Sequence, residues 1–323
     1  MTKPQFKTYM NKCHTKLIEI TINNFKTFDD FKIDGLTQIN FISGKNNVGK
    51  TTFLESCYIN LVSHDIEHYI SSFIKRGSLE FYDGFRNNKN LDKICINSNI
   101  NKTAVNVDTD SIIIEVNGVS KTYPRYEMPK LMGNRAVDNI NFIPSFPINN
   151  DSLSFLFSKI KIARKKDLLN KSLAENFDEN IVEFDFILGT PKLFVLNREE
   201  GWVPLSEFGE GIKRFISIIC AIWASQEGAC FIDEIEDGIH YLHYKKLWQI
   251  IFNTAKEANC QIFASTHSKE MIENYYKEAK NLEMKDISFT TLVRDQKNNI
   301  KAISYDFDWF IHEMSQNHEV RGW

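Results

Sequence analysis

The chain has 323 residues, 42% of them hydrophobic, and a formal net charge of -3 at pH 7. This length allows one large domain or two small ones with an ample core. The charge excludes a protein that coats nucleic acid through bulk positive charge. Apolar stretches stay shorter than the roughly 20 residues needed to cross a bilayer, and the N-terminus lacks the apolar core of a signal peptide. We therefore expect a cytoplasmic protein without a membrane partner.

The six cysteines show no C-x-x-C spacing and no nearby histidine cluster. Cys220 and Cys230 lie in apolar runs, where a thiol behaves as a small hydrophobic group. We expect the cysteines to pack in the core, and we expect no zinc site or disulfide framework.

After a polar lead-in over residues 1–15, the chain predicts a strand at residues 16–22 and a shorter one at 31–33. The segment 38–54, QINFISGKNNVGKTTFL, then reads as an apolar strand, a loop rich in Gly and Asn, and a helix. It contains the G-x-x-x-x-G-K-[ST] pattern of a phosphate-binding loop. The order of strand, loop and helix makes a chance glycine turn the weaker interpretation.

Each residue type in this loop has a physical role in binding phosphate. Gly44 and Gly49 allow backbone angles that bring successive N–H groups toward phosphate oxygens, and the helix N-terminus adds its positive end. We expect Lys50 to face solvent in the empty loop and to reach the β- and γ-phosphates of ATP, and we expect the Thr51 hydroxyl to bind Mg²⁺. The predicted nucleotide contacts are Gly44, Asn46, Asn47, Gly49, Lys50, Thr51 and Thr52.

Residues 64–180 differ in character, with dense asparagine and short apolar runs. Residues 111–116 and 119–123, separated by Asn117-Gly118, predict a hairpin. Residues 151–176 predict one helix that carries a basic run comprising Lys159, Lys161, Arg164, Lys165, Lys166 and Lys171. A solvated helix face is the usual explanation of such a run, and a contact with nucleic acid or an acidic partner is the alternative.

Three further stretches follow in chain order. Residues 204–219 place Ser206, Gly209 and Gly211 before a helical pattern, which is either a second anion-binding helix start or an ordinary helix cap. The strand at 229–232 ends in Asp233 and Glu234, where paired acids would lie beside a phosphate loop. We expect their side chains to point in opposite directions, as on an extended strand.

The paired acids suit different tasks. Asp233 is suited to hold the Mg²⁺ hydration shell, and Glu234 to polarise an attacking water. The last of the three stretches, 261–267, predicts another strand with His267 at its exit. An isolated histidine there would ordinarily be structural, but its place in this series favours a catalytic role.

The four motifs in this order resemble the ABC-class ATPases, specifically their SMC/RecF/OLD-like branch. The stretches that carry the resemblance are GKNNVGKT (44–51), SEFGEG (206–211), IDEIEDGIH (232–240) and STHS (265–268). The form of the last two looks most like OLD-like AAA family ATPases of bacterial anti-phage loci.

The resemblance implies a head dimer in which each ATP lies between the phosphate loop of one subunit and the signature of the other. It makes Ser206, Gly209 and Gly211 contacts to the γ-phosphate in trans, His267 the switch histidine, and Asp237 part of the loop at the dimer interface. It also implies a separate effector protein, such as a nuclease, as a partner.

The sequence departs from the family pattern in two ways. The family places a metal-contacting glutamine between the phosphate loop and the signature, and no Gln occurs here from Thr51 to Ser225. Many OLD-like proteins carry a C-terminal nuclease domain, and the residues after His267 are too few for one. Asp306 and Asp308 are expected in a strand or turn.

We therefore expect an α/β P-loop fold, an ABC-type ATPase head with a mixed sheet flanked by helices, built from residues 1–63 and 181–323. We expect residues 64–180 to form an inserted helical and hairpin subdomain. The favoured function is ATP hydrolysis coupled to head dimerisation that controls an effector. The alternatives are a RecF-like DNA repair ATPase and a nucleotide-gated switch with little turnover.

Overall fold

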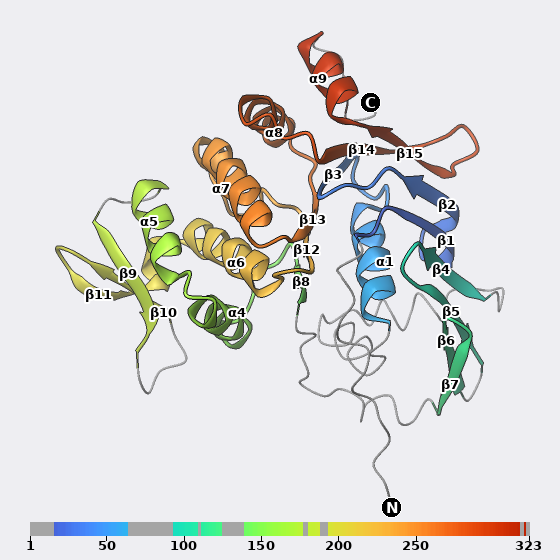
Figure 1. The fold of residues 1–323 in the computed structure, drawn as a ribbon, viewed down its shortest axis with the longest axis horizontal. Helices are drawn as coiled ribbons and strands as arrows, with labels where there is room; N and C mark the ends of the chain where they lie inside the picture. The colour runs from blue at the N-terminus through green and yellow to red at the C-terminus, as the bar shows by residue number, and fades with distance from the viewer. Residues whose placement is uncertain are drawn as a thin grey trace, which may run out of the picture.

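The computed structural model describes residues 16–63, 93–108, 111–124, 139–176, 180–187, 193–316 and 320. These residues form three β-sheets and the helices that cover them (Figure 1). The lead-in expected at residues 1–15 lies outside the described residues. Among the helices that are described, none has both the length and the apolar character that a membrane crossing requires.

A mixed central sheet organises the fold. Its strand order is β15-β14-β3-β13-β12-β8, in which only the edge strand β15 runs antiparallel to its neighbour. The inner strands are buried along nearly their whole length, as expected for a largely parallel sheet that is covered on both faces. The strands are β3 (Ile39–Gly44), β8 (Ile140–Ile143), β12 (Ala229–Ile232), β13 (Gln261–Ser265), β14 (Ile287–Arg294) and β15 (Ile300–Tyr305).

Helix α1 (Lys50–Val62) lies between the central sheet and a second, antiparallel sheet. One hydrophobic cluster joins all three layers: Phe53 and Leu54 of α1 are fully buried there together with Phe231 and Phe263 of the central sheet. The second sheet has the order β2-β1-β4-β5-β6-β7. Its strands are β1 (Glu19–Phe25), β2 (Phe28–Asp34), β4 (Ile94–Ser98), β5 (Lys102–Val107), β6 (Ser111–Val116) and β7 (Val119–Pro124).

The opposite face of the central sheet is covered by helices, several of which Figure 1 shows between that sheet and the small third sheet. Phe41 of β3 packs there against Trp248 and Tyr275, with ring centroids 4.7 Å away in each case. The helices of this side are α4 (Asn150–Ile162), α5 (Lys166–Asn176), α6 (Glu210–Ala224), α7 (Tyr244–Glu257), α8 (Lys269–Asn281) and α9 (Phe307–Ser315), and the short 3₁₀ turns are η2 (Leu205–Phe208) and η3 (Tyr241–His243).

The third sheet has the order β11-β10-β9 and joins the same hydrophobic cluster as α4 and α6. Phe157 of α4 lies 4.6 Å from Phe184 of β9, measured between ring centroids. The strands are β9 (Ile181–Phe186), β10 (Leu193–Asn197) and β11 (Gly201–Pro204).

The α/β fold class is confirmed, as is the hairpin of β6 and β7. The single helix predicted over 151–176 is wrong: Arg164, with φ of 56°, lies in the break between α4 and α5. Asp306 also differs from expectation, because its side chain caps α9 by accepting from the Trp309 N–H.

The sheets do not divide at residue 180. β8 is an edge strand of the central sheet, although it falls inside the segment expected to form an inserted subdomain. β4 continues the N-terminal sheet by pairing with β1. The boundaries at residues 63 and 180 stay a prediction, and any such division leaves β8 with the central sheet.

Candidate nucleotide site

The loop from Gly44 to Gly49 joins β3 to α1 at the carboxyl edge of the central sheet. A Cβ on Gly44 would lie 2.7 Å from both the Leu292 carbonyl oxygen and Val48 Cγ1, so no larger residue fits without movement. Gly49 has φ of 96° and precedes the first residue of α1. The loop therefore delivers the helix N-terminus, with its free N–H groups, to the site.

The other predicted loop contacts differ in their exposure. Asn46 and Asn47 are exposed, and the Asn47 carbonyl accepts a hydrogen bond of 3.1 Å from Arg294. Thr51 is exposed, whereas Thr52 is buried and its carbonyl accepts from the Ser56 hydroxyl at 2.8 Å. A ligand above the loop can therefore reach the asparagines and Thr51 directly, but it meets Thr52 through its backbone N–H.

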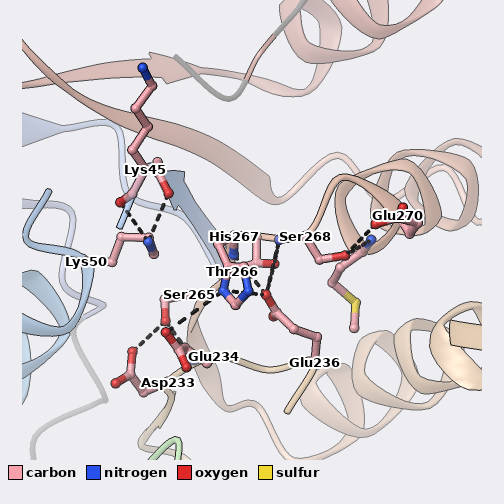
Figure 2. Close-up of polar contacts among 12 residues, drawn as sticks. Lys45, Lys50, Asp233, Glu234, Glu236, Ser265, Thr266, His267, Ser268 and Glu270 are labelled. Atoms are coloured by element: carbon pink, nitrogen blue, oxygen red, sulfur yellow. Dashed lines mark hydrogen bonds and ion pairs between the residues drawn. The ribbon is translucent and has the colours of Figure 1, made fainter. Parts of the chain in front are cut away.

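Lys50 is buried, with 6% of its surface exposed. Its Nζ donates to the carbonyl oxygens of Gly44 (2.9 Å) and Lys45 (3.0 Å), as Figure 2 shows. The expectation that Lys50 faces solvent is therefore wrong: the loop folds back over its ammonium group. Burial lowers the pKa of Lys50, although three neighbouring carboxylates favour its charged form.

Asp233 joins the phosphate loop to the neighbouring strand ends. Its Oδ2 accepts from the Thr51 hydroxyl at 2.9 Å, and its Oδ1 accepts from the Ser265 hydroxyl at 2.6 Å. The carboxylate is 4% exposed. A threonine hydroxyl and an aspartate carboxylate are oxygen ligands that suit Mg²⁺, which keeps most of its water and needs few protein groups. The donor set therefore fits that ion.

Glu234 differs from the extended geometry expected for it. Its φ is 45°, in the left-handed region, so β12 ends at Ile232 and the chain turns at Glu234. The Ser265 hydroxyl oxygen accepts from the Glu234 N–H at 2.9 Å, which fixes this turn against β13. The expectation that Asp233 and Glu234 point in opposite directions assumed an extended strand, and that assumption is wrong.

The carboxyl of Glu234 is half-buried in an acidic environment. Burial raises its pKa, and the charges of Asp237 and Asp233 raise it further, while His267 lowers it. A carboxylate whose pKa is raised toward neutrality is a stronger proton acceptor than an ordinary one. The environment therefore suits a general base.

His267 lies against two carboxylates at the end of β13. Its Nδ1 is 3.2 Å from Glu236 Oε1 and 3.9 Å from Glu234 Oε1. The same Glu236 oxygen accepts from the Thr266 hydroxyl and from the His267 N–H, both at 2.8 Å. Figure 2 shows these side chains converging between β13 and α8. The structure thus brings His267 beside Glu234.

Arg214 of α6 connects the signature helix to the acidic turn. It is 7% exposed, and its Nη2 donates to the backbone oxygens of Asp233 (2.6 Å) and Glu234 (3.2 Å). Its Nη1 donates to the carbonyl of Pro144, just after β8. Burial lowers the pKa of Arg214, although four surrounding carboxylates favour its charged form. The guanidinium therefore links β8, α6 and the turn after β12.

The signature residues lie apart from the phosphate loop. Ser206 is in the turn η2, Gly209 has φ of 83° before α6, and both are exposed. Gly211 faces the turn after β12: a Cβ there would lie 2.7 Å from the Gly238 carbonyl oxygen. Asp237 belongs to that same turn. Among the contacts of the described residues, none joins Ser206 or Gly209 to the phosphate loop.

The basic run is mostly paired within the chain. Lys166 Nζ lies 2.5 Å from a Glu183 oxygen and 2.7 Å from an Asp185 oxygen, and Lys161 Nζ lies 2.6 Å from Asp185. Lys165 contacts Glu257 at 3.2 Å and lies 4.7 Å from the centroid of the Trp223 ring. Carboxylates of the third sheet and α7 therefore neutralise much of the charge that the sequence displays.

Three residues of the site were missed by the sequence interpretation: Arg214, Ser265 and Glu236. Ser265 and Glu236 fall inside the motifs STHS and IDEIEDGIH, so their position in the sequence already indicates that they lie near the site. Arg214 gave none, because a basic residue in the second turn of an exposed-looking helix start is common. Its role depends on α6 packing across β8 and β12.

Part of the chain matches a protein family, and most of it matches a curated relative. Residues 117–273 match the AAA_21 family, described as "AAA domain, putative AbiEii toxin, Type IV TA system". A curated relative from Helicobacter pylori (strain ATCC 700392 / 26695), named "ATP/GTP phosphatase", is 26% identical over 320 residues, covering 79% of this chain and 86% of that protein.

Solved structures of SMC heads share the fold. An SMC head bound to the C-winged helix domain of ScpA aligns with a TM-score of 0.54 and 15% identity, over 91% of this chain and 98% of that one. An Smc head with an extended coiled coil, bound to the C-terminal domain of ScpA derived from Pyrococcus furiosus, aligns with a TM-score of 0.50 and 13% identity. This alignment covers 93% of this chain and 99% of that one. The sequence matches show a resemblance to AAA-domain proteins and to a phosphatase of nucleotides, and the structural similarities show that the chain has the fold of an SMC head.

Proposed function

We propose that this chain binds ATP with Mg²⁺ on the loop from Gly44 to Thr52 and hydrolyses it with Glu234 as the general base. The observation that carries the proposal is the hydrogen bond from Thr51 to Asp233, which unites the phosphate loop with the acidic turn. Thr51 and Asp233 would hold Mg²⁺, whose charge would offset that of the phosphates.

In this proposal the hydrolysis depends mainly on position and charge. Lys50 exchanges its two carbonyl partners for phosphate oxygens, which is a small movement because those carbonyls line the same loop. Glu234 orients a water molecule and accepts its proton as the water attacks the γ-phosphate. His267, whose Nδ1 lies 3.9 Å from Glu234 Oε1, would contact the same phosphate group.

We further propose that the active form is a homodimer or a higher oligomer of heads, with Ser206, Gly209 and Gly211 bound to the nucleotide of the partner subunit. The support is that Ser206 and Gly209 are exposed and that, among the described residues, neither makes a hydrogen bond or ion pair with the phosphate loop of its own chain. Gly211 at the start of α6 packs against Gly238, the residue after Asp237, so a movement of one segment would also move the other. An effector protein in anti-phage defence remains part of the proposal on family resemblance alone.

The nucleic-acid alternative has less support. Lys161, Lys165 and Lys166 already contact carboxylates of the chain, so a phosphate backbone would have to displace them. Binding through these residues would be weak and strongly dependent on salt. A switch without turnover is disfavoured by the position of Glu234 next to Asp233 and 3.9 Å from His267, because binding alone needs no base there.

The test is steady-state release of phosphate by the purified chain with Mg²⁺ and either ATP or GTP, with EDTA as the control. GTP is included because the Helicobacter pylori relative is named for both nucleotides. We expect turnover that depends on Mg²⁺ and is lost in Lys50→Ala. A parent protein that binds nucleotide tightly and releases no phosphate over many hours would favour the switch.

A further inference from the structure

Glu236 is a buried carboxylate that lies beside the proposed catalytic groups and has no role in the function proposed above. Its side chain is 7% exposed and comes from the turn that follows β12. The Oε1 atom accepts from the Thr266 hydroxyl at 2.8 Å and from the backbone N–H groups of His267 (2.8 Å) and Ser268 (3.1 Å). One oxygen thus binds three consecutive residues of the loop between β13 and α8.

These contacts fix the loop that carries His267. Two successive N–H groups that converge on one oxygen form a concave anion site. The Ser268 hydroxyl then begins α8 by accepting from the Met271 N–H at 3.1 Å. The backbone of His267 is therefore held from both sides, by Glu236 and by the helix start.

The imidazole of His267 lies against the same carboxylate oxygen. Nδ1 is 3.2 Å from Glu236 Oε1, closer than the 3.9 Å that separates it from Glu234 Oε1. Since the two ring nitrogens lie on different sides of an imidazole, an Nδ1 turned toward Glu236 leaves Nε2 to act elsewhere. The side chain is 45% exposed, so a ligand can reach it.

The second carboxylate oxygen of Glu236 makes no hydrogen bond within the described part of the chain that would help to hold the loop. Oε2 is buried and has no hydrogen-bond partner among the described residues. A neutral amide would satisfy the three donors equally well through its oxygen, so the loop contacts alone do not require a carboxylate. The negative charge also acts on Lys50 and Arg214, but among the described basic side chains it is His267 that lies in direct contact with Glu236.

From these observations we infer that Glu236 is a positioning residue for ATP hydrolysis, which holds the backbone and Nδ1 of His267 so that Nε2 faces the γ-phosphate. The inference deepens the proposed function and depends on it. It assigns the charge of Glu236 to the transition state rather than to nucleotide binding, because the contacts of Glu236 lie in the loop that carries His267. Removing that charge should reduce kcat and leave KM unchanged.

The main variant is Glu236→Gln, which keeps an acceptor for the three donors and removes the charge. We expect kcat for ATP to fall roughly 10- to 100-fold, the range seen when a group that orients a functional histidine is lost, with KM near the parent value. The melting temperature should fall modestly, because the amide NH2 replaces a buried oxygen that has no partner among the described residues. Glu270→Gln is the matched control. Glu270 accepts from Ser268 in the same loop at 3.0 Å but is exposed, and its loss of charge should leave kcat unchanged.

A double-mutant cycle with His267→Ala tests whether Glu236 acts through the histidine. We expect Glu236→Gln to cause no further loss of kcat once His267 is absent. Should Glu236→Gln not fold, Glu236→Asp keeps the charge but shortens the side chain by one methylene, and it should show the same loss of kcat. Parent-like kcat in Glu236→Gln, a change confined to KM, or independent losses in the cycle would each overturn the inference. A parent that releases no phosphate would instead overturn the proposed function.

Discussion

The Thr51 hydroxyl donates a 2.9 Å hydrogen bond to Asp233 Oδ2, although 182 positions separate the two residues in the sequence. The contact exists because β3 and β12 both lie beside β13 in the central sheet and end at the same edge. Parallel strands place their carboxyl ends together, and ligands bind there in open α/β sheets. The sheet order therefore assembles the site.

Lys50→Ala should abolish ATP binding. Lys50 is the lysine that the G-x-x-x-x-G-K pattern assigns to the terminal phosphates, which it would bind as a point charge. Because the parent Lys50 is buried against two carbonyls, we also expect a modest loss of stability. Calorimetric titration with Mg-ATP measures the affinity. Lys45→Ala, in the same loop but exposed, is the control and should bind ATP; equal affinity in both variants would remove the phosphate-loop assignment.

Much of this edge could be predicted from the sequence, because the phosphate loop, the acidic pair and His267 each follow an apolar run that reads as a strand. The conformation of Lys50 could not, since its partners are carbonyls of a loop whose fold depends on Val48 and Leu292. The left-handed turn at Glu234 escaped prediction because a hydrogen bond to Ser265, on a different strand, stabilises it. The break at Arg164 likewise has no sequence signal such as Gly or Pro.

Ser265→Ala should destabilise the fold and slow ATP hydrolysis. Its hydroxyl donates to Asp233 and accepts from the Glu234 N–H, so the variant leaves two buried polar groups without a partner. We expect a loss of about 1–3 kcal/mol in the free energy of unfolding, measured by urea denaturation. Ser43→Ala is the matched control, because Ser43 is also fully buried but its hydroxyl has no partner among the described residues. Equal losses in the two variants would show that the Ser265 contacts contribute nothing.

The stability of the chain should fall at acidic pH through Asp185. Burial acts to raise the pKa of Asp185, but hydrogen bonds from Lys161 and Lys166 outweigh it, and the pKa lies below its ordinary value of 3.8. A carboxyl whose pKa is lower in the folded state contributes stability above 3.8 and loses it as the pH falls below that value. The contribution is about 1 kcal/mol or less because the pair is partly exposed.

Lys166→Met tests this origin of the acid sensitivity. Lys166 Nζ lies 2.7 Å from Asp185, and methionine keeps the apolar stem without the charge. We expect the variant to be less stable than the parent at pH 6 and to approach it below pH 3.8, in chemical denaturation at both values. A constant difference at the two pH values would assign the effect to packing.

Ser206→Arg should permit ATP binding but block hydrolysis, if the exposed turn before α6 meets the nucleotide of a partner subunit. A large cation there would prevent two heads from closing. Mixed with Lys50→Ala, it should restore at most one working site per dimer. Phosphate release by Ser206→Arg at the parent rate would contradict the shared site. Glu199→Arg, outside the signature, is the control.

Asp233→Asn should weaken binding of Mg-ATP far more than binding of ATP in EDTA. Asparagine keeps one oxygen for Thr51 or Ser265 but loses the charge that a magnesium ion requires. Titrations with and without Mg²⁺ give the two affinities. If the variant loses affinity equally under both conditions, Asp233 supports the loop and not the ion.

The central claim is that Glu234 performs the chemical step, and steady-state ATP turnover by Glu234→Gln tests it most directly. Glutamine preserves the size of the side chain and its reach beside His267 but cannot accept the proton of water. We expect Mg-ATP affinity to stay at the parent value, phosphate release to fall roughly 10²- to 10⁴-fold, and a dimer to accumulate with Mg-ATP on size-exclusion chromatography. Turnover at the parent rate would show that Glu234 is not the general base.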